Sequence, residues 1–304
     1  MGSDHPPSAL MAAAASLLPS LPKAVELVAF GTPDWEQSAK SLGLSFHQVS
    51  EFIEMEENPL SALRKKRDAS LCVGLRLLKT RDLDAFVSAG NTGALVSAAK
   101  MTLGTFPGIL RPALLALMPT KKRPVAVLDV GANLQAKSKH LVQFARLGVA
   151  YQEARGIANP KVGLLNIGSE ASKGTAEIRL AYKELSKLKA FAGNIEGTAV
   201  FDGEVDVIVT DGFTGNVFLK TAEGIASLVL DRIPKDDRLH DLQRHLHYTE
   251  HPGALLCGIK GVVVKCHGYS SPEAFANGIR GAVEFALSSF LEILKKKVVS
   301  STIN

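Results

Sequence analysis

A run of apolar, mostly β-branched residues at 205–209 is followed directly by glycine and small polar residues. These residues include Asp211, Gly212, Thr214, Gly215 and Asn216. The run predicts a strand buried on both faces, and apolar residues at helical spacing from Val217 onward predict a helix. Backbone N–H groups at the start of such a helix point beyond the strand end, where they favour an anion. The stretch is therefore a candidate anion-binding turn, and it is also consistent with an ordinary strand-to-helix turn.

Five further predicted strands end in glycine beside a small polar or charged residue. These strand ends lie at 88–93, 129–133, 166–168, 193–194 and 267–268. They contain the candidate substrate-binding residues Asn91, Thr92, Gly93, Asn133 and His267. Because ligands of open α/β sheets bind beyond the carboxyl ends of the strands, we expect all six turns to line one cleft. For any single turn, a glycine that serves only close packing is an equally good interpretation.

Three lysines, Lys173, Lys220 and Lys265, lie in or near these turns and could supply positive charge. Lys173 is predicted at a helix start, where a cation opposes the helix dipole by about 0.3 to 1 kcal/mol. An anion shared between the lysine and the helix would offset that cost. Lys220 is interpreted as an exposed helix residue. His267 could titrate near neutral pH, but a hydrogen-bonded structural histidine is the favoured interpretation.

Sequence motifs of several common enzyme classes are absent. No GxGxxG opens a helix after a strand, no GxxxxGK[ST] is present, and no GxSxG occurs. No CxxC, HExxH or other His/Cys metal spacing is found either. The sequence therefore argues against a dinucleotide site, a P-loop and a serine hydrolase, and we expect no metal and no nicotinamide cofactor.

Predicted strands and helices alternate along most of the chain. The strands are expected at 25–30, 45–49, 85–88, 111–118, 125–130, 161–167, 205–209 and 261–265. Helices are expected between them, and a single long helix is expected at 272–298. This alternation predicts an α/β fold with a mostly parallel sheet and helices on both faces.

Composition narrows the class of protein. The chain has 304 residues, 46% of them apolar, so a single domain spanning 1–304 is expected. The net charge is +5, but no basic stripe alternates with aromatic residues, so nucleic acid is not an expected partner. Basic clusters could still meet an acidic partner or anionic lipid headgroups. Three cysteines in apolar surroundings favour reduced thiols and a cytoplasmic protein, and no apolar run reaches 18 residues.

Ten segments occur in an order that resembles one family. They are EMEENP with ALRKK (54–66), SAGNTGAL (88–95), GILRPAL (108–114), LDVGAN (128–133), QFARLG (143–148), VGLLNIG (162–168), KG (173–174), GNIEG (193–197), DGFTGNVFLKT (211–221) and KGVVVKCHG (260–268). Together they resemble the bacterial phosphate acyltransferases of the PlsX type, over nearly the whole chain. The resemblance implies a Rossmann-like α/β/α sandwich related to the isocitrate/isopropylmalate dehydrogenases and to phosphotransacetylase.

The resemblance also implies a reaction and partners. An acyl group passes from acyl-[acyl-carrier protein] to inorganic phosphate, and the acyl phosphate then supplies a membrane glycerol-3-phosphate acyltransferase in phospholipid synthesis. The family is homodimeric and associates peripherally with the membrane. A helical excursion is expected at 224–252, where an amphipathic tip could touch lipid. A dimer contact or plain surface is the favoured interpretation of this segment.

The sequence departs from the family pattern at its start. The family usually begins with a short strand and a D-x-M-G-G-D motif, whereas here only Met1-Gly2-Ser3-Asp4 corresponds to it. We therefore expect that one short core strand precedes this start. The segments Glu250-His251-Pro252-Gly253-Ala254 and Ser169-Glu170 also differ from the common pattern, which affects substrate details only.

The resemblance suggests roles for individual residues. Phosphate has a second pKa of about 6 to 7, and the leaving thiol has a pKa of about 8.5, so no strong general base is needed. Lys173 is assigned to hold the phosphate, and Asn216 to donate to the thioester oxygen as it becomes an oxyanion. The remaining candidates for the cradle around phosphate and acyl carbonyl are Asn91, Thr92, Gly93, Asn133, Asp211, Gly212, Thr214, Gly215, Lys265 and His267.

Three other functions remain open at this point. The first is a phosphotransacetylase that uses acyl-CoA. The second is a β-decarboxylating NAD dehydrogenase, which would need metal-binding aspartates and a nucleotide site. Asp129, Asp202 and Asp211 are present, but without the expected motif context. The third is a non-catalytic regulator that binds acyl-carrier protein.

Overall fold

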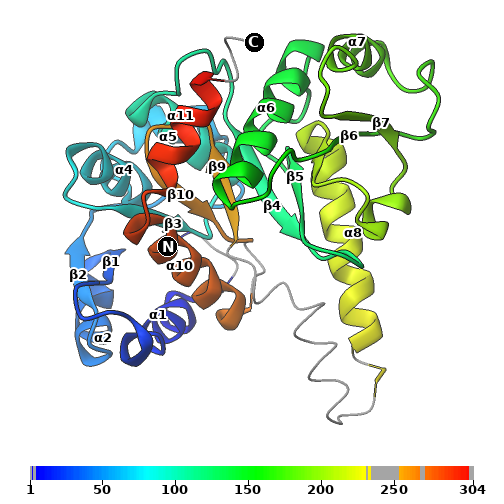
Figure 1. Cartoon of the computed structure of the whole chain (residues 1–304). Coiled ribbons are helices and arrows are strands. Elements are labelled where there is room, and N and C mark those ends of the chain that lie inside the picture. The colour runs from blue at the N-terminus through cyan, green and yellow to red at the C-terminus, as the bar shows by residue number, and fades with distance from the viewer. Residues whose placement is uncertain (1, 3–4, 231, 234–252, 268–270, 301–304) are drawn as a thin grey trace. The chain divides into compact units, whose positions relative to one another are not determined.

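The computed structural model describes residues 2, 5–230, 232–233, 253–267 and 271–300 (Figure 1). The chain divides into two compact units. Unit 1 comprises Met1–Thr105 and Pro252–Leu291, and unit 2 comprises Phe106–His251 and Glu292–Asn304. The expectation of one domain over 1–304 stays a prediction, and most of the excursion at 224–252 lies outside the described residues.

Unit 1 contains a parallel two-stranded sheet and a three-stranded sheet segment covered by helices. Its elements are α1 (Pro7–Ala15), η1 (Leu18–Ser20), β1 (Val28–Gly31), η2 (Pro33–Trp35), α2 (Glu36–Ser41), β2 (Ser45–Gln48), α3 (Pro59–Lys65), α4 (Ser70–Thr80), β3 (Ala85–Ser88), α5 (Thr92–Leu103), β9 (Ala254–Cys257), β10 (Val262–Lys265) and α10 (Pro272–Leu287). β1 pairs with β2, and β10 pairs in parallel with β3 and antiparallel with β9. The extra strand expected before residue 1 stays a prediction.

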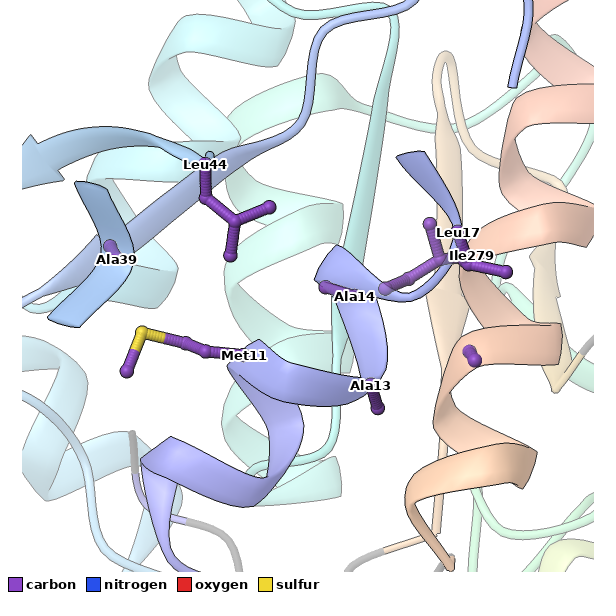
Figure 2. Close-up of a cluster of buried hydrophobic side chains, with 8 residues drawn as sticks. Met11, Ala13, Ala14, Leu17, Ala39, Leu44 and Ile279 are labelled. Atoms are coloured by element: carbon purple, nitrogen blue, oxygen red, sulfur yellow. The ribbon is translucent and has the colours of Figure 1, made fainter. Parts of the chain in front are cut away.

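A small apolar cluster fixes the N-terminal helix of unit 1 to α10. Figure 2 shows Met11, Ala14 and Leu17 from the start of the chain near Leu44 and Ile279. All five side chains are buried. Small residues on α1 allow the two helices to approach closely, so the first helix is held by packing against the C-terminal part of the unit.

Unit 2 is built on a five-stranded sheet in the order β4-β5-β8-β6-β7. Its elements are β4 (Ala113–Met118), β5 (Val125–Leu128), α6 (Ser138–Ala154), β6 (Val162–Leu165), α7 (Ala176–Leu185), β7 (Phe191–Ile195), η3 (Ala199–Asp202), β8 (Val207–Val209), α8 (Gly212–Leu230) and most of α11 (Phe290–Ser300). β5, β8, β6 and β7 are parallel, and β4 runs antiparallel to β5. The predicted α/β fold with a mostly parallel sheet is confirmed.

The strands of unit 2 are apolar because helices bury them. Every residue of β5 and β8 is buried, and α6 packs across both strands. α8 contacts β5 and continues beyond the sheet, as its long yellow ribbon shows in Figure 1. The β-branched run that predicted a doubly buried strand therefore forms β8 in the middle of this sheet.

Four features of secondary structure differ from the prediction. α8 begins at Gly212 rather than at Val217, because the Asp211 carboxylate accepts a hydrogen bond from Thr214 N (2.8 Å) and caps the helix. The predicted helix at 272–298 is two helices, since the chain becomes extended at Ser288. β9 was not predicted, and Gly193 and Asn194 lie inside β7 rather than after it.

Candidate active site

The glycine-bearing turns gather at one sheet edge within each unit. In unit 2, segments 129–133, 166–174 and 211–216 follow β5, β6 and β8, which are parallel neighbours. In unit 1, segments 88–93 and 265–267 follow the parallel pair β3 and β10. Lys173 and Asn216 therefore both belong to the carboxyl edge of the unit 2 sheet. The prediction that the turns share an edge is confirmed within each unit for five of the six, and it is wrong for 193–194, which lies inside β7. A single cleft formed by the turns stays a prediction.

Asp129 organises the turn after β5. Its fully buried carboxylate accepts hydrogen bonds from the backbone N–H groups of Leu114, Gly131, Ala132 and Asn133, and from the Asn133 amide. Burial raises the pKa of the Asp129 carboxyl above its usual value, and the hydrogen bonds from Ala132, Asn133 and Leu114 oppose this rise only in part. Asn133 Nδ2 also donates to Pro112 O (2.8 Å), so its amide group supports the turn. The sequence indicated Asn133 as a binding residue, whereas the structure shows that its amide is engaged within the protein.

Gly212 and Gly215 bring the start of α8 against this turn. A Cβ on Gly212 would lie 2.6 Å from Asn133 O, and a Cβ on Gly215 would lie 2.0 Å from Asp129 O. Both distances are far below van der Waals contact, so only glycine fits at these positions. Gly212 and Gly215 therefore allow the two turns to pack closely. This role is the alternative that the sequence left open for these glycines.

The backbone of the α8 start has little capacity left for an anion. Gly212 N donates to Asn133 O (2.8 Å), Thr214 N donates to the Asp211 carboxylate, and Gly215 N donates to Asp211 O (2.9 Å). At most one of the four amides at 212–215 remains for a ligand. Asp211 also places a carboxylate at the helix start, where it competes with a bound anion. Side chains must therefore supply most of any phosphate and oxyanion binding in unit 2.

Asn216 is the amide side chain best placed to bind an oxyanion in unit 2. It lies in the second turn of α8, half-buried, with its Cγ 3.8 Å from an ideal Cβ on Gly131. Within the described part of the chain, no hydrogen bond holds its side-chain amide. A half-buried amide with unused donors beside a glycine turn can donate to a developing oxyanion.

Lys173 supplies a cation from the neighbouring strand end. Its carbonyl accepts a hydrogen bond from Asn166 Nδ2 (3.2 Å), and the next carbonyl, at Gly174, accepts one from Arg179 Nη1 (2.5 Å). These contacts fix the loop, whereas the Lys173 side chain is 48% exposed and its Nζ lies 3.9 Å from a Glu170 carboxylate oxygen. α7 begins three residues later at Ala176, so Lys173 precedes the helix rather than lying in its first turn. A fixed loop with a weakly paired ammonium suits the capture of a dianion.

The candidate binding residues of unit 1 make more hydrogen bonds and packing contacts within the protein. Asn91 caps α5 by accepting from Ala94 N (3.0 Å), and its Nδ2 donates to three carbonyls in the segment 54–57. A Cβ on Gly93 would lie 2.7 Å from Pro59 Cγ, so this glycine also serves packing. Their roles in substrate binding, and that of Thr92 in the first turn of α5, stay predictions.

Lys265 and His267 lie at the end of β10. Lys265 pairs in register with Ser88 of β3, and its buried ammonium donates to the Cys266 carbonyl. His267 is half-buried and directly follows this strand end. The parallel pairing places both residues at the edge where segment 88–93 also lies, and their part in binding stays a prediction.

The aspartates required by a dehydrogenase do not converge. Asp129 is occupied by N–H donors, Asp202 forms an ion pair with Lys121 (2.6 Å), and Asp211 caps α8. Within the described ranges, no group of three or more His, Cys, Asp or Glu residues could hold a metal ion. The same ranges contain no helix that is long and apolar enough to cross a membrane.

The Lys173→Ala variant tests the cation. We expect kcat/KM for phosphate to fall by about 10- to 100-fold, because a hydrogen bond to a charged group contributes about 1.5 to 3 kcal/mol. Steady-state kinetics at varied phosphate concentrations measure this change. Lys220→Ala is the matched control, because Lys220 is an exposed lysine of α8 that makes no part of this loop. Equal effects of the two substitutions would contradict the assignment.

Glu223 on α8 predicts a pH dependence of stability. Burial raises the pKa of its carboxyl to about 7, and the neighbouring Lys220 opposes this shift only in part. Because the folded pKa lies above the unfolded one, stability is lost as pH rises from the unfolded pKa through about 7. Between about pH 5 and pH 8, wild-type protein should lose about 2 kcal/mol more than Glu223→Gln. Urea unfolding at both pH values measures this, and parallel losses would show the prediction to be wrong.

Comparison with known proteins identifies relatives of this chain. The family model described as "Fatty acid synthesis protein" matches residues 1–292. A phosphate acyltransferase of Chlamydia pneumoniae is 46% identical, with 83% of this chain and 78% of that protein covered. A phosphate acyltransferase of Thermoanaerobacter pseudethanolicus is 39% identical, with 99% and 96% covered.

Solved structures with a similar fold share little sequence. A phosphotransacetylase from Streptococcus pyogenes is 18% identical with a TM-score of 0.63, and 92% of this chain and 91% of that chain are covered. A branched-chain phosphotransacylase from Enterococcus faecalis V583 is 13% identical with a TM-score of 0.65, covering 94% and 97%. At these identities the likeness extends to the fold alone.

Proposed function

This chain belongs to the phosphate acyltransferase family, and from that premise we propose that its acyl donor is an acyl-carrier-protein thioester on which Lys173 and Asn216 act. Acyl transfer to phosphate itself follows from family membership. The proposal concerns the donor and the residues that carry the reaction. One observation supports it most: the half-buried amide of Asn216 and the exposed side chain of Lys173 follow neighbouring parallel strands at one sheet edge.

The two side chains have complementary tasks in this reaction. A phosphate oxygen attacks the thioester carbonyl carbon, the carbonyl oxygen becomes an oxyanion, and the C–S bond then breaks. The departing thiolate takes the proton that remains on phosphate, so acyl phosphate and free thiol are the products. Lys173 holds the phosphate dianion as a point charge, and Asn216 donates to the oxyanion. No general base is required, because the nucleophile is already ionised near pH 7.

The site also fits a place in lipid synthesis. Acyl phosphate is an activated acyl group, so an acyltransferase that uses glycerol 3-phosphate at a membrane is its expected consumer. A net charge of +5 is compatible with an acidic carrier protein and with anionic membranes. Homodimer formation, peripheral membrane association and kinship of the fold to isocitrate/isopropylmalate dehydrogenases complete the proposal. Most of the segment 224–252, whose tip could touch lipid, lies outside the described residues.

A direct assay tests the donor. Purified protein is incubated with phosphate and either palmitoyl-carrier protein or palmitoyl-CoA, and hydroxylamine traps acyl phosphate as a hydroxamate. We expect efficient hydroxamate formation and thiol release with the carrier protein, and much slower turnover with CoA. Preference for CoA would indicate a phosphotransacetylase. Binding of the carrier protein without turnover would instead support a regulator, and a copurifying dinucleotide in mass spectra would support a dehydrogenase.

A further inference from the structure

Asn194 is a buried amide near the carboxyl end of β7. This strand is the outermost one of the unit 2 sheet, beside β6 (Figure 1). Asn194 lies one residue before the end of β7 and is only 7% exposed. Amide side chains are seldom buried this far unless their polar atoms form hydrogen bonds. The hydrogen-bond partners of Asn194 therefore indicate what its amide does.

The amide donor of Asn194 reaches the turn that carries Lys173. Asn194 Nδ2 donates to Glu170 O (2.8 Å). The same carbonyl accepts a hydrogen bond from Lys173 N (3.1 Å), which closes a four-residue turn over 170–173. One carbonyl oxygen thus joins the Asn194 amide to the backbone of Lys173. Because Asn194 belongs to a strand, it ties this turn to a rigid element of the fold.

A second asparagine holds the other side of the same turn. Asn166 directly follows β6, and its backbone N donates to Ile195 O at the end of β7 (2.9 Å). Its Nδ2 donates to Lys173 O (3.2 Å). The N–H of Lys173 is therefore fixed by way of Glu170 and Asn194, and its carbonyl is fixed by Asn166. The position of Lys173 thus depends on the ends of two neighbouring parallel strands.

An irregularity in β7 sets the direction of the Asn194 side chain. Val162 of β6 pairs with Phe191, but the next residue of β6 pairs with Gly193, so β7 contains one extra residue. Gly193 has a φ of 102°, a conformation that glycine adopts readily. A bulge of this kind re-aims the side chains that follow it, and bulges are common beside functional sites. In this strand, the residue after the bulge is the asparagine that contacts the Lys173 turn.

The oxygen of the same amide is unfavourable for stability. Asn194 Oδ1 is buried and accepts no hydrogen bond from the described residues. A buried acceptor without a donor disfavours the folded state, and an apolar side chain of similar size would avoid this penalty. The hydrogen bond to Glu170 O is the contribution that such an apolar side chain could not make. The burial of an amide here therefore points to a role in holding the turn.

We infer that Asn194 is a positioning residue, which holds the turn over 170–173 so that the Lys173 ammonium lies where phosphate binds. The inference rests on the proposed function, since it requires that Lys173 binds phosphate. The Asn194 amide contacts the turn, so its loss should weaken phosphate binding and leave the chemical step intact. The KM for phosphate should rise about three- to tenfold, as expected for one uncharged hydrogen bond. The kcat should stay within about twofold of wild type.

Asn194→Leu tests the inference, because it removes the amide at similar volume. Hydroxamate formation from palmitoyl-carrier protein at varied phosphate concentrations gives KM and kcat. Isothermal titration calorimetry with inorganic phosphate alone gives a Kd without any acyl donor. We expect KM and Kd to rise together while kcat changes little. Asn194→Val, which suits a strand, is a second variant and should give the same shifts. Unchanged KM and Kd in both variants would overturn the inference.

Gln152→Met is the matched control. Gln152 is a fully buried amide of α6 in the same unit, and its Oε1 also has no donor among the described residues. Its Nε2 donates to Asp206 O (2.6 Å), which precedes β8 at the amino edge of the sheet, away from Lys173. Gln152→Met should therefore leave the KM and Kd for phosphate unchanged. Equal rises in Gln152→Met and Asn194→Leu would indicate general loosening of the unit and overturn the inference.

The Lys173→Ala background shows whether Asn194 acts through Lys173. In that background Asn194→Leu should change the Kd for phosphate by less than about twofold, because the ammonium that it positions is absent. An undiminished effect of Asn194→Leu would mean that the amide acts elsewhere, and the inference would be wrong.

The same measurements separate this inference from the proposed function. If Lys173→Ala weakens phosphate binding and Asn194→Leu does not, the proposed role of Lys173 stands and only the inference fails. If Lys173→Ala binds phosphate as wild type does, both fail. The calorimetric comparison needs no thioester, so it tests the inference even if palmitoyl-carrier protein is not a donor.

Discussion

Replacing Asn216 with alanine is expected to lower kcat for acyl phosphate formation by about 100- to 1000-fold, the usual effect of losing one oxyanion donor. The side chain has no hydrogen bond to other described residues and is only half-buried, so the fold should survive its loss. The KM for phosphate should change little, because Lys173 rather than Asn216 holds that substrate. Steady-state hydroxamate formation measures both constants.

Two further measurements serve as controls for this prediction. Asn216→Asp keeps the side-chain shape but replaces the donor with a carboxylate, so it should lose at least as much activity as the alanine variant. Thermal unfolding of both variants should match wild type within a few degrees, which excludes misfolding as the cause. Retention of more than about a tenth of wild-type kcat by Asn216→Ala would remove this residue from the mechanism.

Gly215→Ala is expected to be the most destabilising single substitution at the site. The new Cβ would lie 2.0 Å from the backbone oxygen of Asp129 and 2.8 Å from the Thr210 methyl group. Backbone atoms cannot move aside without breaking the hydrogen bonds that hold the Asp129 turn, so the start of α8 must shift. We expect a loss of about 3 to 5 kcal/mol in the free energy of unfolding, or failure to fold.

The same helix provides a matched control. Gly224 on α8 is exposed, and a Cβ there would meet nothing within 4 Å. Gly224→Ala should therefore stabilise the protein by up to about 1 kcal/mol, since alanine is the better helix former. Urea unfolding of the two variants gives both free energies. Similar stability of Gly215→Ala and Gly224→Ala would mean that the close approach to Asp129 is not rigid.

Local sequence patterns were sufficient to predict much of the fold. The β-branched run that became β8 is buried on both faces, and its neighbours β5 and β6 were equally apolar. Glycine-bearing turns at the ends of these strands indicated the candidate functional edge, because parallel strands bring their carboxyl ends together. Family resemblance then supplied the assignment of Lys173 and Asn216, which composition and spacing alone did not provide.

Long-range contacts account for what the sequence could not show. The sequence did not distinguish Asp129 from the other acidic residues. Only the structure shows that five N–H donors converge on its carboxylate. The start of α8 was placed five residues too late, because Gly212 and Gly215 usually indicate a turn rather than a helix.

The central claim is that the side chains of Lys173 and Asn216 act on one reaction at one sheet edge. A double-mutant cycle on these two residues tests this claim most directly. The quantity measured is kcat/KM for acyl phosphate formed from labelled phosphate and palmitoyl-carrier protein. Our account predicts a large loss in each single variant and a double variant that loses clearly less than the product of the two, because both residues contact the same transition state. Full activity in either single variant, or effects that multiply without coupling, would contradict it.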